Sequence, residues 1–136
     1  MVHLLSDLEL TALHFALLLP DVFDIREQYP LAPEAHADDL GAYDAAALRR
    51  ASPGTRALAK SLRITHPLCR GDGQSAPWIL TTDLLITLRA LNQRPSLLAV
   101  AVKPAEALSA RRTCRLLAVE QAYWEAQAVP WMLLTP

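Results

Sequence analysis

Two charged side chains stand in segments that otherwise have the composition of buried strands. Asp83 follows Thr82 and precedes a run of leucine and isoleucine, and Lys103 ends the apolar run 97–102. A charge inside an apolar strand costs several kcal/mol unless it is paired, hydrogen-bonded or bound to a metal. The sequence therefore indicates that Asp83 and Lys103 belong to a site.

The chemistry that such a pair suits is phosphodiester hydrolysis. This reaction needs a metal held by carboxylates, which polarises the phosphoryl oxygen and activates water, and a cation that stabilises the charge of the transition state. Mg²⁺ fits because it keeps several waters and needs only one or two protein carboxylates. Asp83 would supply one carboxylate and Lys103 the ammonium group, and acids on the first and last helices could complete the site.

The first half of the chain must position the first of these acids. Ser6 and Glu9 form a capping box that starts a helix ending before Pro20. A strand is expected over 22–31, and 33–50 should be helical in part. Ser52 and Pro53 suit the cap and first turn of a helix over 53–62, which makes 33–62 a helical insertion after the first strand. Residues 65–77 have the composition of a loop.

The second half supplies the central strands. We expect strands over 78–88 and 97–103, a long helix over 109–127 and a last strand over 131–135, which together give a mixed sheet flanked by helices. Trp78, Trp124 and Trp131 are assigned to the core.

Bulk properties are those of one globular domain. The chain has 136 residues, of which 52% are hydrophobic, and none of its apolar runs approaches the roughly 18 residues of a membrane span. We expect a soluble cytoplasmic protein without membrane contact. Cys69 and Cys114 have neither disulfide-framework nor zinc-ligand spacing.

The charges are unevenly distributed along the chain. Residues 49–115 hold twelve of the thirteen lysines and arginines but three of the fourteen acids, a net +9, whereas the remainder carries −10. This asymmetry favours a face that contacts phosphates, although the charges could also spread around the folded surface. Three arginines, Arg111, Arg112 and Arg115, begin the long helix, where they oppose its dipole; phosphate contact would explain their placement.

Five segments in order resemble the N-terminal catalytic domain of the TnsA transposon endonucleases. They are Leu4-Leu5-Ser6-Asp7-Leu8-Glu9, Ile25-Arg26-Glu27-Gln28-Tyr29-Pro30-Leu31, Thr81-Thr82-Asp83, Ala99-Val100-Ala101-Val102-Lys103 and Glu120-x-x-Tyr123-Trp124. The resemblance covers nearly the whole chain. It implies an α/β fold with the restriction-endonuclease-like αβββαβ core of the PD-(D/E)XK nucleases, in a single domain over 1–136 without the C-terminal domain that engages the ATPase.

The resemblance also implies an activity and its residues. It implies a Mg²⁺-dependent endonuclease, for which Mn²⁺ can substitute, that cuts transposon-end DNA beside a TnsB-type DDE transposase, with a TnsC-type ATPase as a further partner. The catalytic residues would be Glu9, Asp83, Lys103 and Glu120, and the metal would be held by Asp83, Glu9 and the backbone of Ala101 and Val102. Arg111, Arg112 and Arg115 would bind DNA, and Gln28 is a further candidate.

One position departs from the family pattern. Where these nucleases usually carry Gln, Glu or Asp two residues before the lysine, this chain has Ala101, so one side-chain ligand is missing. This motivates an alternative, a nuclease-fold module with little or no catalysis that binds DNA and docks the transposase. A third interpretation is another member of the nuclease superfamily, such as a repair or restriction enzyme.

Several site residues also have ordinary structural explanations. Glu9 is accounted for by the capping box, and Lys103 could extend from its strand end to solvent. Gln28 could hydrogen-bond a loop, and Glu120 could pair with Arg56, Arg63 or a backbone group.

Overall fold

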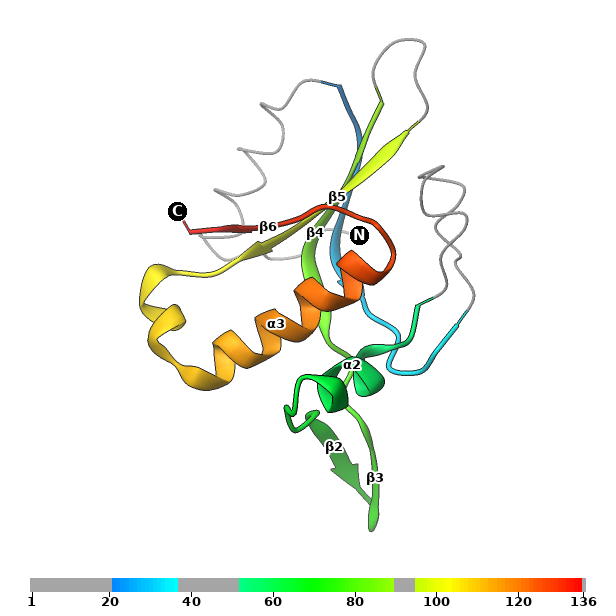
Figure 1. Cartoon of the computed structure of the whole chain (residues 1–136), viewed down its shortest axis with the longest axis vertical. Coiled ribbons are helices and arrows are strands. Elements are labelled where there is room, and N and C mark those ends of the chain that lie inside the picture. Colours follow the sequence, from blue (N-terminus) through cyan, green and yellow to red (C-terminus); the bar gives the residue numbers. More distant parts are fainter. Residues whose placement is uncertain (1–20, 37–51, 90–94, 136) are drawn as a thin grey trace.

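The computed structural model describes residues 21–36, 52–89 and 95–135, which form a mixed α/β domain (Figure 1). The helices and strands, in chain order, are β1 (Val22–Pro30), α2 (Thr55–Ser61), β2 (Leu68–Gly71), β3 (Gln74–Pro77), β4 (Thr81–Leu88), β5 (Ser96–Val102), the 3₁₀ helix η2 (Ala105–Ser109), α3 (Arg111–Ala126) and β6 (Trp131–Leu134). Among these described residues, no helix is long and apolar enough to cross a bilayer.

The main sheet has the strand order β1-β4-β5-β6. β1 and β5 both pair antiparallel with β4, whereas β6 pairs parallel with β5 after the crossover through α3. The mixed sheet predicted from the sequence is therefore confirmed. The full αβββαβ core stays a prediction, because residues 1–20, for which the first helix and Glu9 were predicted, lie outside the described residues.

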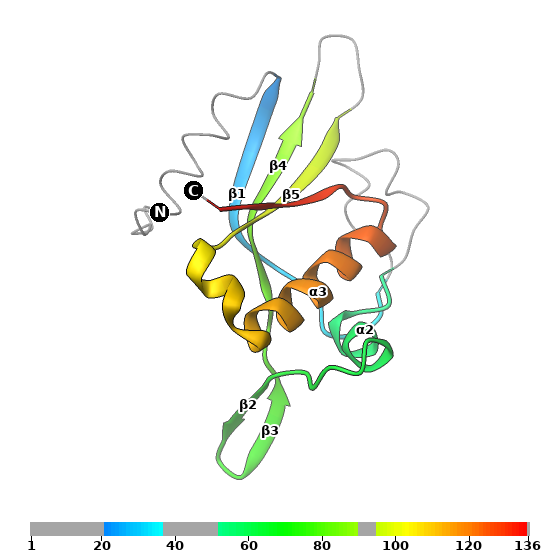
Figure 2. The ribbon, with the colours of Figure 1, turned by 60° about the vertical axis from the view of Figure 1, so that its left-hand side comes forward.

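Helix α3 covers one face of this sheet in both views (Figure 2). The core beneath it contains Leu85 and Ala99 from the central strands and Tyr123 and Trp124 from α3. A second cluster, which includes Leu84, Ile86, Val100 and Val102, occupies the opposite face. Successive side chains of a strand point to opposite faces, so Asp83 and Lys103 lie on the α3 side with Leu85 and Ala99.

The segment 65–77, predicted as a loop, contains the β2–β3 hairpin, so that prediction is wrong. Gly71 pairs with Gln74, and the intervening Asp72 and Gly73 both have positive φ, 52° and 74°. Asp-Gly is the sequence that such two-residue hairpin turns favour. The strands are short and almost entirely exposed, and they include Gly71 and Pro77, which explains why their composition resembled a loop. The hairpin extends away from the main sheet in both views (Figure 2).

The start of α2 also differs from the prediction. The helix begins at Thr55, and the Ser52 hydroxyl accepts a hydrogen bond from the Gly54 amide, which lies before the helix. Gly54 has φ 88°, and a Cβ there would lie 2.5 Å from the carbonyl carbon of Glu34. The N-cap residue is thus Gly54, packed closely on this neighbouring segment, and the predicted cap by Ser52 is wrong. Of the predicted insertion 33–62, residues 37–51 lie outside the described residues, and the insertion stays a prediction.

The three tryptophans have different environments. Trp124 is fully buried, as predicted, and Trp131 is partly buried against the core. Trp78 is 54% exposed, so its assignment to the core is wrong. Strand β4 begins at Thr81, and Trp78 belongs to the segment between β3 and β4, outside the sheet that would have covered its side chain.

Candidate active site

Asp83 lies near the start of β4 and is held by three hydrogen-bond donors. Its Oδ2 accepts from the Val102 backbone amide at 2.7 Å and from Lys103 Nζ at 3.2 Å, and its Oδ1 accepts from Gln28 Nε2 at 3.3 Å. The residue is 8% exposed. Hydrogen bonds to the ionised form compensate the cost of burying a carboxylate. The two charges that the sequence assigned to a site thus form an ion pair in the structure.

Lys103 follows β5 directly and completes this pair. Its backbone amide donates to the Leu134 carbonyl at 3.1 Å, which continues the parallel pairing with β6 and fixes where the side chain leaves the sheet. About a third of the Lys103 side chain, 32%, is exposed. The ammonium group therefore contacts the buried carboxylate and remains accessible to a bound anion.

Ala101 lies beside Asp83 on the face that α3 covers. The register pairs Leu84 with Val100, so Asp83 and Ala101 each lie one residue beyond that pair, on the same side of the sheet. Ala101 is fully buried. Its methyl group offers no ligand at the position where the family pattern has a carboxylate or an amide.

Gln28 reaches the same carboxylate from β1 through an unusual backbone. It lies between the pairs Glu27–Leu84 and Tyr29–Thr82, and its φ is 50°, in the left-handed region that non-glycine residues rarely adopt. Its Oε1 accepts a hydrogen bond from Thr81 Oγ1 at 3.0 Å. Such strain costs on the order of 1 kcal/mol and is typical of functional positions. The structure thus joins Gln28 to the candidate site and not only to a loop.

Glu120 lies on α3 and is buried, with 6% of its surface exposed. Its Oε2 accepts a hydrogen bond from Trp131 Nε1 at 2.9 Å. The pKa of Glu120 is raised to about 7, chiefly by burial and also by the nearby Asp83 charge, while the Trp131 hydrogen bond and the Lys103 charge act in the opposite direction. Arg56, one partner considered from the sequence, pairs instead with Glu34 at 2.6 Å.

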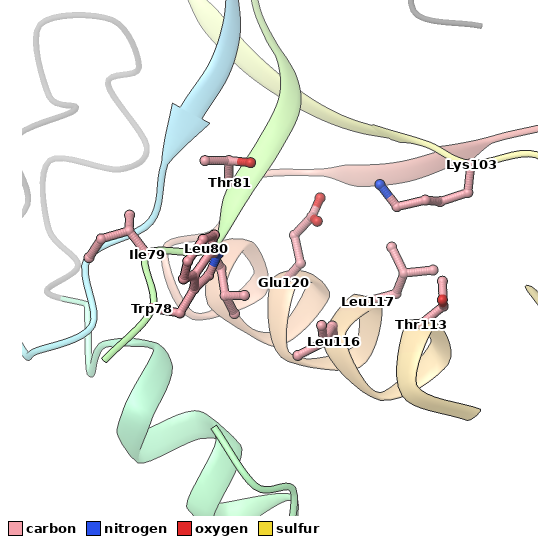
Figure 3. Close-up of a pocket in the computed structure, with 9 residues that line it drawn as sticks. All are labelled: Trp78, Ile79, Leu80, Thr81, Lys103, Thr113, Leu116, Leu117 and Glu120. Atoms are coloured by element: carbon pink, nitrogen blue, oxygen red, sulfur yellow. The ribbon is translucent and has the colours of Figure 1, made fainter. Parts of the chain in front are cut away.

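Lys103 and Glu120 line one pocket of about 220 Å³ with Thr81 and Thr113. In Figure 3 the ammonium group and the carboxylate extend into the same space between α3 and the strands. The pocket therefore brings together a cation and a carboxyl group that is partly protonated at neutral pH.

Two hydrogen bonds made by tryptophans support this arrangement, and the sequence did not reveal them. Trp124 Nε1 donates to Thr82 Oγ1 at 2.6 Å, which ties α3 to the residue before Asp83. Trp131 Nε1, from β6, donates to Glu120 Oε2 and so ties β6 to α3. Thr82, Glu120 and Trp124 stood in the motifs and Trp131 in an expected strand, but nothing in their spacing indicated which polar groups would meet.

The three arginines of α3 remain apart from Asp83. Arg111, Arg112 and Arg115 are exposed near the helix start, and Arg112 Nη1 donates to the Thr65 carbonyl at 2.9 Å. One arginine thus fixes the segment before the β2–β3 hairpin against α3. DNA contact by these residues stays a prediction.

The donor atoms near Asp83 are suitable for a divalent cation. Among the described residues, no group of three His, Cys, Asp or Glu side chains is close enough to hold a metal. A site of one or two carboxylates supplemented by waters and phosphate oxygens is typical of Mg²⁺. The Asp83 carboxylate fits one protein oxygen ligand of such a site.

The structure is thus a mixed α/β domain whose central strands carry an aspartate–lysine pair beside a buried glutamate. Comparison with known proteins makes the assignment specific. The family described as TnsA-like endonuclease N terminal matches residues 19–136, and the chain belongs to that family.

One curated relative supports the same assignment. It is the transposon Tn7 transposition protein TnsA of Escherichia coli, 34% identical over 133 residues, which cover 98% of this chain and 40% of the relative. The chain thus spans about two fifths of the length of that relative. The resemblance inferred from the sequence motifs is confirmed.

Proposed function

We propose that the chain is the catalytic endonuclease module of a heteromeric transposase and that it hydrolyses phosphodiester bonds at transposon ends. The observation that carries this proposal is the buried Asp83 carboxylate 3.2 Å from Lys103 Nζ, on adjoining strands of a TnsA-like domain. Its proposed setting is the bacterial cytoplasm, with a TnsB-type transposase and a TnsC-type ATPase as partners and DNA held in part by Arg111, Arg112 and Arg115.

The proposed cofactor is Mg²⁺, with Mn²⁺ as a substitute. Asp83, Glu9 and the backbone oxygens of Ala101 and Val102 would hold it. When bound, Mg²⁺ supplies Lewis acidity toward the phosphoryl oxygen and lowers the pKa of a coordinated water. The fit rests on Asp83, because hydrogen bonds from Gln28 on β1, Val102 at the end of β5 and Lys103 just after β5 hold its carboxylate in place.

The protein's own residues supply orientation, charge and a proton-transfer group. Lys103 Nζ is placed to stabilise negative charge on the phosphate oxygens as the bond to the leaving oxygen breaks. Glu120, with a pKa of about 7, is present in both protonation states near neutral pH, which suits a group that accepts or donates a proton. Gln28 and the Val102 amide hold the Asp83 carboxylate in one orientation.

A plasmid-nicking assay tests this function. Supercoiled plasmid carrying a transposon end is incubated with the chain and Mg²⁺, with and without a TnsB-type transposase. We expect nicked product in Mg²⁺ and none in EDTA. Nicking that persists in EDTA would contradict the metal-dependent mechanism.

The buried Ala101 favours a second candidate function, a module that binds DNA and docks the transposase without cutting. A metal site that lacks one side-chain ligand would bind its ion more weakly. Retention of transposon-end DNA and transposase, without nicking in any divalent metal, would support this function over the first.

Gln28 gives a prediction that concerns metal binding alone. In Gln28→Leu the Asp83 carboxylate loses an orienting donor, and loss of such an outer partner typically weakens metal binding by about 10- to 100-fold. Isothermal titration with Mn²⁺ measures this loss. Gln121→Leu, which removes an exposed glutamine on α3, is the matched control and should bind Mn²⁺ like the wild type. Unchanged Mn²⁺ binding in Gln28→Leu would exclude the positioning role.

A further inference from the structure

The pocket that contains Lys103 and Glu120 is apolar on its other side. Trp78, Ile79 and Leu80 line the pocket there, and Leu116 and Leu117 of α3 add further apolar surface (Figure 3). Figure 3 shows the Trp78 indole beside Leu80, on the opposite side of the pocket from Lys103. Hydrolysis of a phosphodiester needs charged and polar groups, so these apolar side chains have no role in the chemistry described above.

Trp78 is exposed although its backbone is held in place. Its amide donates to the Pro67 carbonyl at 2.9 Å, which closes the base of the β2–β3 hairpin, while 54% of the residue remains accessible. The neighbouring Ile79 is 45% exposed. Large apolar side chains at the mouth of a pocket, beside a few polar groups, are typical of a ligand-binding site.

The cations near the pocket, which has Glu120 as an acid in its lining, suit a ligand that joins an anionic group to an aromatic or apolar one. Lys103 lies on one wall, and the helix that forms another wall begins with the exposed Arg111, Arg112 and Arg115. A nucleotide combines these features, because its phosphate is attracted to the cations and its base offers a π face. Base stacking on an aromatic side chain tolerates any sequence and is common in proteins that hold single-stranded DNA.

We propose that this pocket is a subsite for one unstacked nucleobase of the DNA strand being cut, with the base stacked on Trp78 and its phosphate directed toward Lys103. The inference rests on the proposed function, since it takes DNA as the substrate. Trp78 would then position the strand without taking part in the chemistry.

Binding of a fluorescent oligonucleotide in EDTA tests the subsite without any cleavage. The probe is a short single-stranded deoxyoligonucleotide with 2-aminopurine at one position, which loses fluorescence when it stacks on indole. Wild type should quench the probe, Trp78→Phe should keep most of the affinity, and Trp78→Ala should bind roughly tenfold or more weakly. Phe23→Ala is the matched control: Phe23 is another exposed aromatic, 63% accessible, at the opposite end of β1 from Gln28, and its loss should not change binding.

Two results would overturn the proposal. If Trp78→Ala binds and quenches like the wild type, the pocket does not hold a base and is left for another occupant, such as an apolar segment of a partner protein. Failure of the wild type to bind the oligonucleotide would overturn it as well. Nicking is assayed separately in Mg²⁺, so the two proposals can fail independently. If the wild type quenches the probe but does not nick, only the proposed endonuclease function is contradicted. If the wild type nicks but Trp78→Ala binds the probe equally well, only the subsite is contradicted.

Discussion

Asp83→Asn should nick transposon-end plasmid about three orders of magnitude more slowly than the wild type in Mg²⁺. Asparagine keeps the shape of the side chain and an oxygen that can accept from the Val102 amide, but it lacks the negative charge that would hold the metal. Metal activation supplies several kcal/mol of transition-state stabilisation, and each 1.36 kcal/mol corresponds to a factor of ten. Single-turnover nicking rates measure the effect.

This variant should lose some stability, about 1–3 kcal/mol, because the asparagine NH2 group replaces an oxygen that accepts a hydrogen bond in a buried site, so nicking is compared at a temperature at which both proteins are folded. The Lys103 side chain, which loses its charged partner, is one-third exposed and can be solvated. Asp72→Asn is a matched control, because Asp72 occupies the exposed hairpin turn with φ 52°, a conformation that asparagine also accepts. Equal nicking by wild type and Asp83→Asn would remove the basis of the proposed mechanism.

Glu120 should make the protein less stable as the pH rises. Its pKa is about 7 in the folded state and near 4.5 when unfolded, so the folded protein binds the extra proton between these values. This contribution is fully present below pH 4.5 and is lost as the pH rises through 7. From pH 5 to pH 8 the free energy of unfolding should fall by about 2–3 kcal/mol more in wild type than in Glu120→Gln.

Urea unfolding at the two pH values, in EDTA, measures this difference. Glu125→Gln, an exposed position on the same helix, is the control and should keep the wild-type pH dependence. The same pH dependence in wild type and Glu120→Gln would show that burial does not raise the pKa of Glu120.

The sequence was most informative where a residue contradicted its surroundings. Asp83 and Lys103 were conspicuous because a charge in an apolar strand must be compensated, and the two groups do compensate each other at 3.2 Å. The long helix and the strands of the main sheet followed from hydrophobic patterning. These features depend on local composition or on a large energetic cost, both of which are visible in one sequence.

Other features depend on tertiary contacts that one sequence does not specify. The partner of Glu120 is the indole of Trp131, which comes close only because the chain reverses between α3 and β6. Trp78 resembles a core residue by type, yet it precedes the sheet and borders a pocket. The hairpin was missed for a different reason: its Asp72-Gly73 turn was visible, but its short exposed strands lack the alternation that identifies a strand.

Anomalous diffraction from crystals soaked in Mn²⁺ tests the central claim most directly, because it locates the metal independently of activity. We expect a manganese peak within about 2.5 Å of an Asp83 carboxylate oxygen, on the side of the backbone of residues 101 and 102. The same soak of Asp83→Asn crystals should lack that peak. Two results would contradict the assignment of Asp83 as the metal ligand. One is a wild-type peak elsewhere, and the other is the absence of manganese at Asp83 in crystals of protein that nicks plasmid in solution.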